Sequence, residues 1–183
     1  MALWTVLTVL GAVVLFLILS YNSFVKLRLR ADNSWSDIDV QLKRRHDLIP
    51  NIVETVKGYA SHEKGTFENI ARIRSTAMQA TGPAERAQAE GQLSVALKSL
   101  FAVAESYPQL RASEQFTSLQ SALNEVEDQV QNARRYYNAV VRDLNTMIAS
   151  FPSNVVAGLF GFSPRQFFEI TSAGEREPVA VKF

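Results

Sequence analysis

Few residues in this chain of 183 have the types and spacing needed for catalysis or metal binding. The first candidates are its two histidines. His62 and Glu63 begin like the helical zinc-protease motif, in which a second histidine follows four residues after the first. Thr66 occupies that position. We therefore predict that His62 lies on a solvated surface, because a zinc ligand is missing from the required helix face.

The remaining candidates for chemistry are also incomplete. A proton relay at His46 would need burial near an acid, and only Asp47 adjoins it, so a surface position is the expectation. Arg134 and Arg135 indicate a charged helix face more than an anion site. The chain has no cysteine, which excludes disulfides and thiolate metal sites, and it shows no glycine-rich phosphate loop and no catalytic serine motif. We expect that the chain is not an enzyme and that it binds neither a metal nor a cofactor.

The elements that carry these residues are long helices. Apolar residues recur from Phe116 to Phe151 at alternating steps of three and four, which is the a/d stripe of a heptad helix. The stripe consists of Phe116, Leu119, Leu123, Val126, Val130, Ala133, Tyr137, Val140, Leu144, Met147 and Phe151. One such helix cannot bury its own stripe. We expect the apolar face from Ile52 to Ala77 and a shorter helix after Pro83 to cover it, and an intermolecular coiled coil is the alternative.

Other stretches of the chain are also predicted to be helical. An apolar stripe runs from Phe24 to Ile49, and Pro50 either kinks a continuous helix or occupies the first turn of a new one. The apolar face from Ile52 to Ala77 predicts one long helical stretch, with glycines 58 and 65 as weak points. A further helix is expected to begin at Pro83 and to end before Pro108, since the residue before proline avoids helical geometry.

Residues Ala2 to Tyr21 carry no charge and are long enough to cross a bilayer. We interpret them as an uncleaved membrane anchor, because the basic region and the small-residue cleavage site of a signal peptide are missing. Basic residues follow the span but do not precede it, so the positive-inside rule places the remaining chain in the cytoplasm. This basic cluster comprises Lys26, Arg28, Arg30, Lys43, Arg44 and Arg45, and contact with membrane lipid is compatible with it.

Phenylalanine is concentrated after Pro152. The residues Phe160, Phe162, Phe167 and Phe168 either fold back to cap the bundle or contact a second subunit or the bilayer interface. A short alternating segment, Val179–Phe183, is either a strand or a disordered end.

The predicted fold is all-α: a transmembrane helix, an antiparallel bundle of long helices (three, or four if the chain folds at Pro50), and a short Phe-rich element. The predicted domains are an anchor at 1–25, a bundle at 26–170 and a tail at 171–183.

Several stretches of the chain resemble the LemA family. They are residues 42–51 (Leu-Lys-Arg-Arg-His-Asp-Leu-Ile-Pro-Asn), 56–60 with His62-Glu63, 107–110, Tyr137-Asn138, residues 151–153 and 167–169, and the final Lys182-Phe183. The resemblance implies a bacterial inner-membrane protein with a short extracytoplasmic amino terminus, a cytoplasmic helical bundle and no established enzymatic activity. His46 differs from the smaller or more varied residues of that position in the family.

Two classes of function fit these features. The first is a membrane-anchored scaffold or structural protein that assembles with copies of itself. The alternative is an adaptor or regulator of a membrane-bound protease or envelope-stress pathway, which the family resemblance suggests. The nearly equal numbers of basic and acidic residues, 19 and 18, argue against a nucleic-acid partner.

Overall fold

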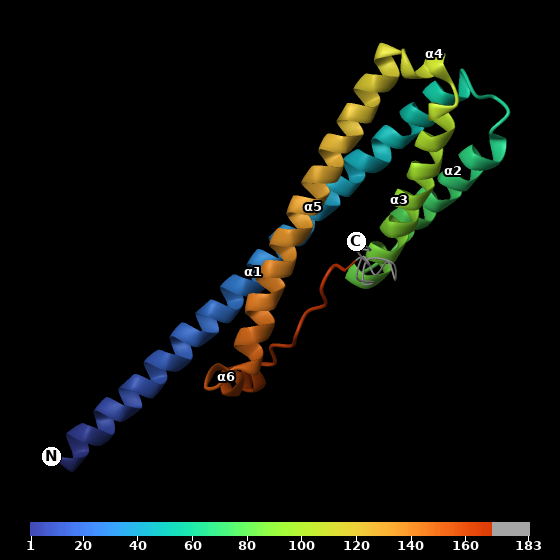
Figure 1. Cartoon of the computed structure of the whole chain (residues 1–183). Helices are drawn as coiled ribbons and strands as arrows, with labels where there is room; N and C mark the ends of the chain where they lie inside the picture. The colour runs from blue at the N-terminus through green and yellow to red at the C-terminus, as the bar shows by residue number, and fades with distance from the viewer. Residues whose placement is uncertain (170–183) are drawn as a thin grey trace, which may run out of the picture. The chain divides into compact units, whose positions relative to one another are not determined.

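The computed structural model describes residues 1–169, and α-helices account for most of them (Figure 1). The helices are α1 (Ala2–Lys57), α2 (Lys64–Gln79), α3 (Pro83–Glu105), α4 (Pro108–Arg111), α5 (Glu114–Ala149) and α6 (Ser153–Phe160). No strand occurs among residues 1–169, so the prediction of an all-α chain is confirmed. The predicted tail at 171–183, with its alternating segment, lies outside the described residues.

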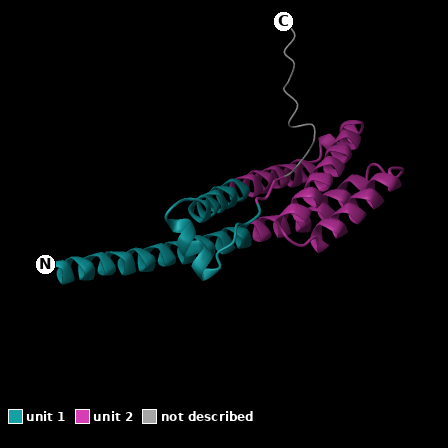
Figure 2. Ribbon diagram, turned by 90° about the horizontal axis from the view of Figure 1, so that it is seen from below, with its two compact units in different colours: residues 1–37, 133–166 teal, residues 38–132, 167–183 magenta. Residues whose placement is uncertain are grey.

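The chain divides into two compact units (Figure 2). Of the described residues, unit 1 contains 1–37 and 133–166, and unit 2 contains 38–132 and 167–169. The two long helices α1 and α5 each contribute residues to both units. The predicted domain boundary at residue 25 falls inside α1.

Helix α1 continues through Pro50 and ends at Lys57, which decides between the two alternatives for this proline. The chain folds instead at Gly58 to Glu63, where Ala60 N–H donates to the Val56 carbonyl at 2.8 Å. The expected single helical stretch from Ile52 to Ala77 is therefore wrong, since it is split between α1 and α2. The bundle consequently has four long helices.

The core of unit 2 is formed by the end of α1, by α2 and α3, and by the beginning of α5. Its buried side chains include Ile52 of α1, Phe67 of α2, Leu93 of α3 and Leu123 of α5. Helix α3 begins at Pro83, as the sequence predicts, and Gly82 before it has the positive φ of 78° that glycine adopts without strain. The first half of the α5 stripe is thus buried by the same chain.

The core of unit 1 buries the second half of that stripe. Phe24 of α1, Leu144 of α5, and Val156 and Ala157 of α6 form one buried cluster. Helix α1 therefore covers this part of α5 through Phe24, whereas the sequence interpretation assigned the stripe to the face from Ile52 to Ala77 and to the shorter helix after Pro83. Phe151 is a second correction: α5 ends at Ala149, and the Phe151 side chain is 83% exposed.

The segment after α6 is fixed to α5 by hydrogen bonds. Asn145 accepts a bond from the Arg165 backbone N–H at 2.8 Å and donates one to the Arg165 carbonyl at 2.9 Å. The Tyr137 hydroxyl donates to the Gln166 carbonyl at 2.9 Å. Burial raises the pKa of Tyr137 above its ordinary value, while the positive charge of Arg165 opposes this shift and the carboxylate of Asp32 adds to it.

Candidate functional site

A buried polar cluster lies in unit 2 at residues Arg45 and His46 of α1 and Glu90 of α3. The Arg45 guanidinium donates to one Glu90 carboxylate oxygen at 2.7 Å, and His46 Nε2 lies 2.7 Å from the other. The side chains of Arg45 and Glu90 are 2% and 1% exposed. Glu90 therefore has both carboxylate oxygens engaged by basic side chains in the interior of unit 2.

Two further side chains complete the surroundings of Arg45. Its second guanidinium nitrogen lies 2.6 Å from a Glu127 carboxylate oxygen of α5 and donates to the Ser94 hydroxyl of α3 at 2.8 Å. The cluster thus joins three helices through one cation. A histidine paired with a glutamate has the composition of an acid–base pair. Here both are buried and Arg45 occupies the second carboxylate oxygen, so the arrangement favours a structural role.

Pro50 explains a hydrogen bond beside this cluster. Proline has no N–H, so the carbonyl four residues earlier in the helix, that of His46, loses its helical partner. The Arg74 side chain of α2 donates to this carbonyl at 2.8 Å. The proline is therefore accommodated inside α1 because a neighbouring helix supplies the missing donor.

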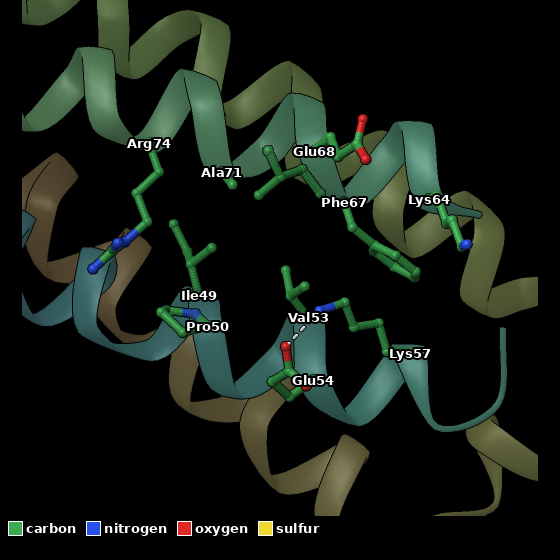
Figure 3. Close-up of a pocket in the computed structure, with 11 residues that line it drawn as sticks. Ile49, Pro50, Val53, Glu54, Lys57, Lys64, Phe67, Glu68, Ala71 and Arg74 are labelled. Atoms are coloured by element: carbon green, nitrogen blue, oxygen red, sulfur yellow. Dashed lines mark hydrogen bonds and ion pairs between the residues drawn. The ribbon is translucent and has the colours of Figure 1, made fainter. Parts of the chain in front are cut away.

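A pocket of about 520 Å³ lies between α1 and α2 next to this bond (Figure 3). Ile49, Val53 and Phe67 point into the space between the two helices and form its apolar part. Charged side chains surround them, and Lys57 donates to Glu54 at 2.7 Å at the rim. The remaining lining residues are Pro50, Lys64, Glu68, Ile70, Ala71 and Arg74.

The pocket combines apolar residues with charged residues of both signs. Its lining includes no histidine, serine, threonine or tyrosine, and its charged residues are Glu54, Lys57, Lys64, Glu68 and Arg74. An apolar floor with a rim of both charge signs matches the side chains of an amphipathic helix. Within residues 1–169, no group of three His, Cys, Asp or Glu side chains comes together to hold a metal ion.

The two histidines have different surroundings. His62 is exposed, as predicted, and lies in the turn between α1 and α2. The prediction that His46 lies on the surface is wrong, because Glu90 provides the buried acid that its sequence neighbours do not. Sequence reasoning missed Glu90 and Arg74. Glu90 precedes Leu93, Leu97 and Leu100 at steps of three, four and three, so a charge on this apolar stripe was the available signal.

The residues of the basic cluster that is expected to set membrane topology differ in their solvent exposure. Lys26, Arg28, Arg30, Lys43 and Arg44 are exposed, whereas Arg45 is buried in its ion pairs. The Arg28 guanidinium carbon also lies 5.9 Å from the centre of the Phe162 ring, within the range of a cation–π contact.

The Phe-rich residues also separate into two groups. Phe168 is fully buried and Phe167 is half-buried in unit 2, while in unit 1 the Phe162 ring stacks on Phe24 with a centroid distance of 4.7 Å. These three are engaged within the chain. Phe160 remains 53% exposed, and its ring lies 4.9 Å from that of Tyr21.

The first helix begins with an exposed apolar segment. Its N-terminal part is long and apolar enough to cross a membrane, and none of that apolar window is buried. Together, the helical fold, this exposed apolar helix and the buried polar cluster define a membrane-associated, all-helical protein. The chain matches the LemA family model over residues 34–183, and it belongs to the LemA family.

Curated relatives extend this assignment. The chain is 26% identical over 185 residues to magnetosome protein MamQ 2 of Paramagnetospirillum magneticum, covering 87% of this chain and 68% of the relative. It is 24% identical over 192 residues to magnetosome protein MamQ of Magnetospirillum gryphiswaldense, covering 91% and 71%. It is 26% identical over 140 residues to protein LemA of Metamycoplasma hominis, covering 74% and 63%.

Proposed function

We propose that this chain is a membrane-anchored, non-enzymatic scaffold that assembles with copies of itself and presents its helical bundle at the membrane surface. One observation carries the proposal: α1 is a single helix that begins as an exposed apolar segment and ends in the core of unit 2. The anchor is therefore joined to folded structure by helix and not by a flexible linker. Such a joint suits a protein that holds other components at a membrane.

The surroundings of the polar residues support a non-enzymatic role. Glu90 is held by two basic side chains in the interior, and the pocket between α1 and α2 is lined by residues suited to binding. The relatives point in the same direction, because differently named proteins, MamQ and LemA, share similarity with most of this chain. An architectural role requires that these proteins share a fold, but it does not require that they share a substrate.

We further propose that the membrane is the bacterial inner membrane and that the bundle lies in the cytoplasm. The five exposed basic residues of the topology cluster support this orientation, since they all follow the apolar segment.

A mass measurement on the full chain in detergent tests whether the protein assembles with copies of itself. Light scattering should find a homo-assembly of defined size, and chemical cross-linking in the native membrane should give the same stoichiometry. A monomer in both measurements contradicts the proposal of self-assembly.

The pocket favours the alternative function, an adaptor for a membrane protease, which would bind an amphipathic helix of that partner. In that case Ala71→Tyr, at the exposed rim, should abolish co-purification of the protease. The matched change Ser75→Tyr, on α2 but outside the pocket, should preserve it. Equal behaviour of the two variants contradicts the adaptor.

A further inference from the structure

The α6 element, defined as residues 150–163, presents two different faces. Val156 and Ala157 are buried in the core of unit 1. Val155 and Leu159, which are four residues apart and therefore neighbours on one helix face, are exposed, and Leu159 is 70% exposed. Phe151 and Phe160 at the two ends of the element are also exposed. The element thus combines a buried apolar side with an exposed apolar side.

Charge is missing from this part of the sequence. No Asp, Glu, Lys or Arg occurs in the 21 residues from Leu144 to Pro164. An exposed helix in water ordinarily carries charged side chains on its outer face, and large apolar patches on soluble surfaces mark places where something binds. The exposed side of α6 therefore has the composition of a contact surface.

Ring contacts place this surface beside the end of the candidate membrane span. The Tyr21 ring lies 4.9 Å from Phe160 and 5.8 Å from Phe162, and Phe162 also stacks on Phe24. Tyr21 is the last residue of the predicted membrane span, Ala2 to Tyr21, and Lys26 is the first charged residue after it. Tyrosine at the end of a span is typical of the boundary between the apolar core and the headgroups. The α6 element is therefore held at the depth of that boundary.

The chain around Gly161 explains how α6 reaches this position. Gly161 ends the helix with a φ of 71°, and the Phe162 N–H donates to the Ala157 carbonyl at 3.0 Å. This turn directs Phe162 back onto Phe24. Arg28 lies over the Phe162 ring, and Lys26 and Arg30 are exposed on the same stretch of α1. Basic side chains at this level match anionic headgroups.

We propose that the α6 element lies in the interface of the bilayer that holds the N-terminal span, with Phe151, Val155, Leu159 and Phe160 in contact with lipid. The chain then touches the membrane at two places, one crossing the bilayer and the other lying in its surface. A short helix with an uncharged, apolar outer face suits that surface position. This inference rests on the membrane anchorage of the proposed function, but it holds for either orientation of the span.

Site-directed spin labelling tests the depth of α6, and the chain has no native cysteine to interfere. The full chain carries one nitroxide at Leu159→Cys in vesicles of phosphatidylcholine and phosphatidylglycerol. The matched control is Val95→Cys on α3 in unit 2, where the native side chain is also apolar and 64% exposed. Leu10→Cys, inside the apolar run, is the depth standard. Circular dichroism establishes that each variant retains the helical content of the parent chain.

Collisions of the nitroxide with oxygen and with a water-soluble nickel chelate provide the readout. At Leu159 the nickel collision rate should be several-fold lower than at Val95, and the oxygen rate should be higher. Equal nickel rates at the two positions overturn the proposal, and shielding from both reagents with spin coupling between copies overturns it in favour of a subunit contact. Nickel access at Leu10 instead contradicts the membrane anchorage, so the two failures are distinguishable.

Discussion

Removing the carboxylate of Glu90 should destabilise the bundle more than any change of a surface acid. In Glu90→Ala, Arg45 keeps Glu127 and Ser94 but loses its fully buried partner, and His46 loses the acid at its Nε2. A buried cation is then only partly compensated. The perturbation acts inside unit 2, where these residues lie.

The magnitude follows from the contacts that are lost. Hydrogen bonds to charged groups contribute about 1.5 to 3 kcal/mol each, and Glu90 accepts from Arg45 and pairs with His46. Breaking a buried ion pair by removing one partner costs about 3 to 5 kcal/mol. Glu127, whose side chain is 31% exposed, stays paired with Arg45 and partly balances its charge. We expect a loss of about 3 to 5 kcal/mol in the free energy of unfolding.

Urea unfolding of the full chain in detergent micelles, followed by circular dichroism, measures this loss. Glu125→Ala is the matched control, because Glu125 is an exposed acid on α5, and surface changes usually stay within about 0.5 kcal/mol. A second variant, Glu90→Gln, preserves the shape of the side chain and should fall between the two. A cost below about 1 kcal/mol for Glu90→Ala, with an unchanged m-value, would refute the interpretation that the cluster stabilises unit 2.

Three further predictions concern other parts of the chain. Leu123→Ala should cost about 2 to 5 kcal/mol in unfolding free energy, because its side chain is buried in the core of unit 2, and melting of the isolated soluble domain should not depend on protein concentration. The unfolding free energy should fall above about pH 10, because the pKa of Tyr137 is raised in the folded state and its contribution to stability lasts only while the phenol keeps its proton. The fall should be smaller in Tyr137→Phe, which has no phenol to titrate. A reporter enzyme active only in the periplasm should be inactive when fused after Phe183.

Each of these predictions has a control and a contradicting result. For Leu123, the control is Val95→Ala at an exposed apolar site, and a steep concentration dependence of melting would favour an intermolecular coiled coil. For Tyr137, an equal alkaline loss in the Phe variant would contradict the assignment to this residue. For the fusion, periplasmic activity together with inactivity of a cytoplasmic reporter at the same site would reverse the proposed orientation.

The sequence predicted the helices well where local signals agree. Pro83 and the Tyr107-Pro108 pair bound α3, and the heptad stripe located α5, because helix starts, helix ends and apolar spacing are properties of neighbouring residues. Gly58 was recognised only as a weak point, and the chain folds there. Pro50 looked equally disruptive, but its effect depends on Arg74, which lies 24 residues away in the sequence.

The polar cluster was not predicted, because its members are far apart in sequence. His46 and Glu90 are 44 residues apart and belong to different helices, so only the packing of α1 against α3 brings them together. A closer interpretation of the stripes would have found a signal. Arg45 lies between Leu42 and Ile49 at steps of three and four, so each of two facing apolar stripes contains one charge, and the two charges have opposite signs.

The pairing of Arg45 with Glu90 also limits how α1 and α3 can slide along each other. A displacement by one helical turn, about 5.4 Å, would carry the guanidinium away from the carboxylate and place both against leucine and isoleucine side chains. Apolar stripes alone tolerate such a slip, since one leucine resembles the next. With a single pair of opposite charges, every shifted alignment would bury two ions away from each other, which costs free energy. The cluster therefore selects one axial alignment among several that bury similar apolar area, which is a contribution to uniqueness of the fold and separate from its free energy of unfolding.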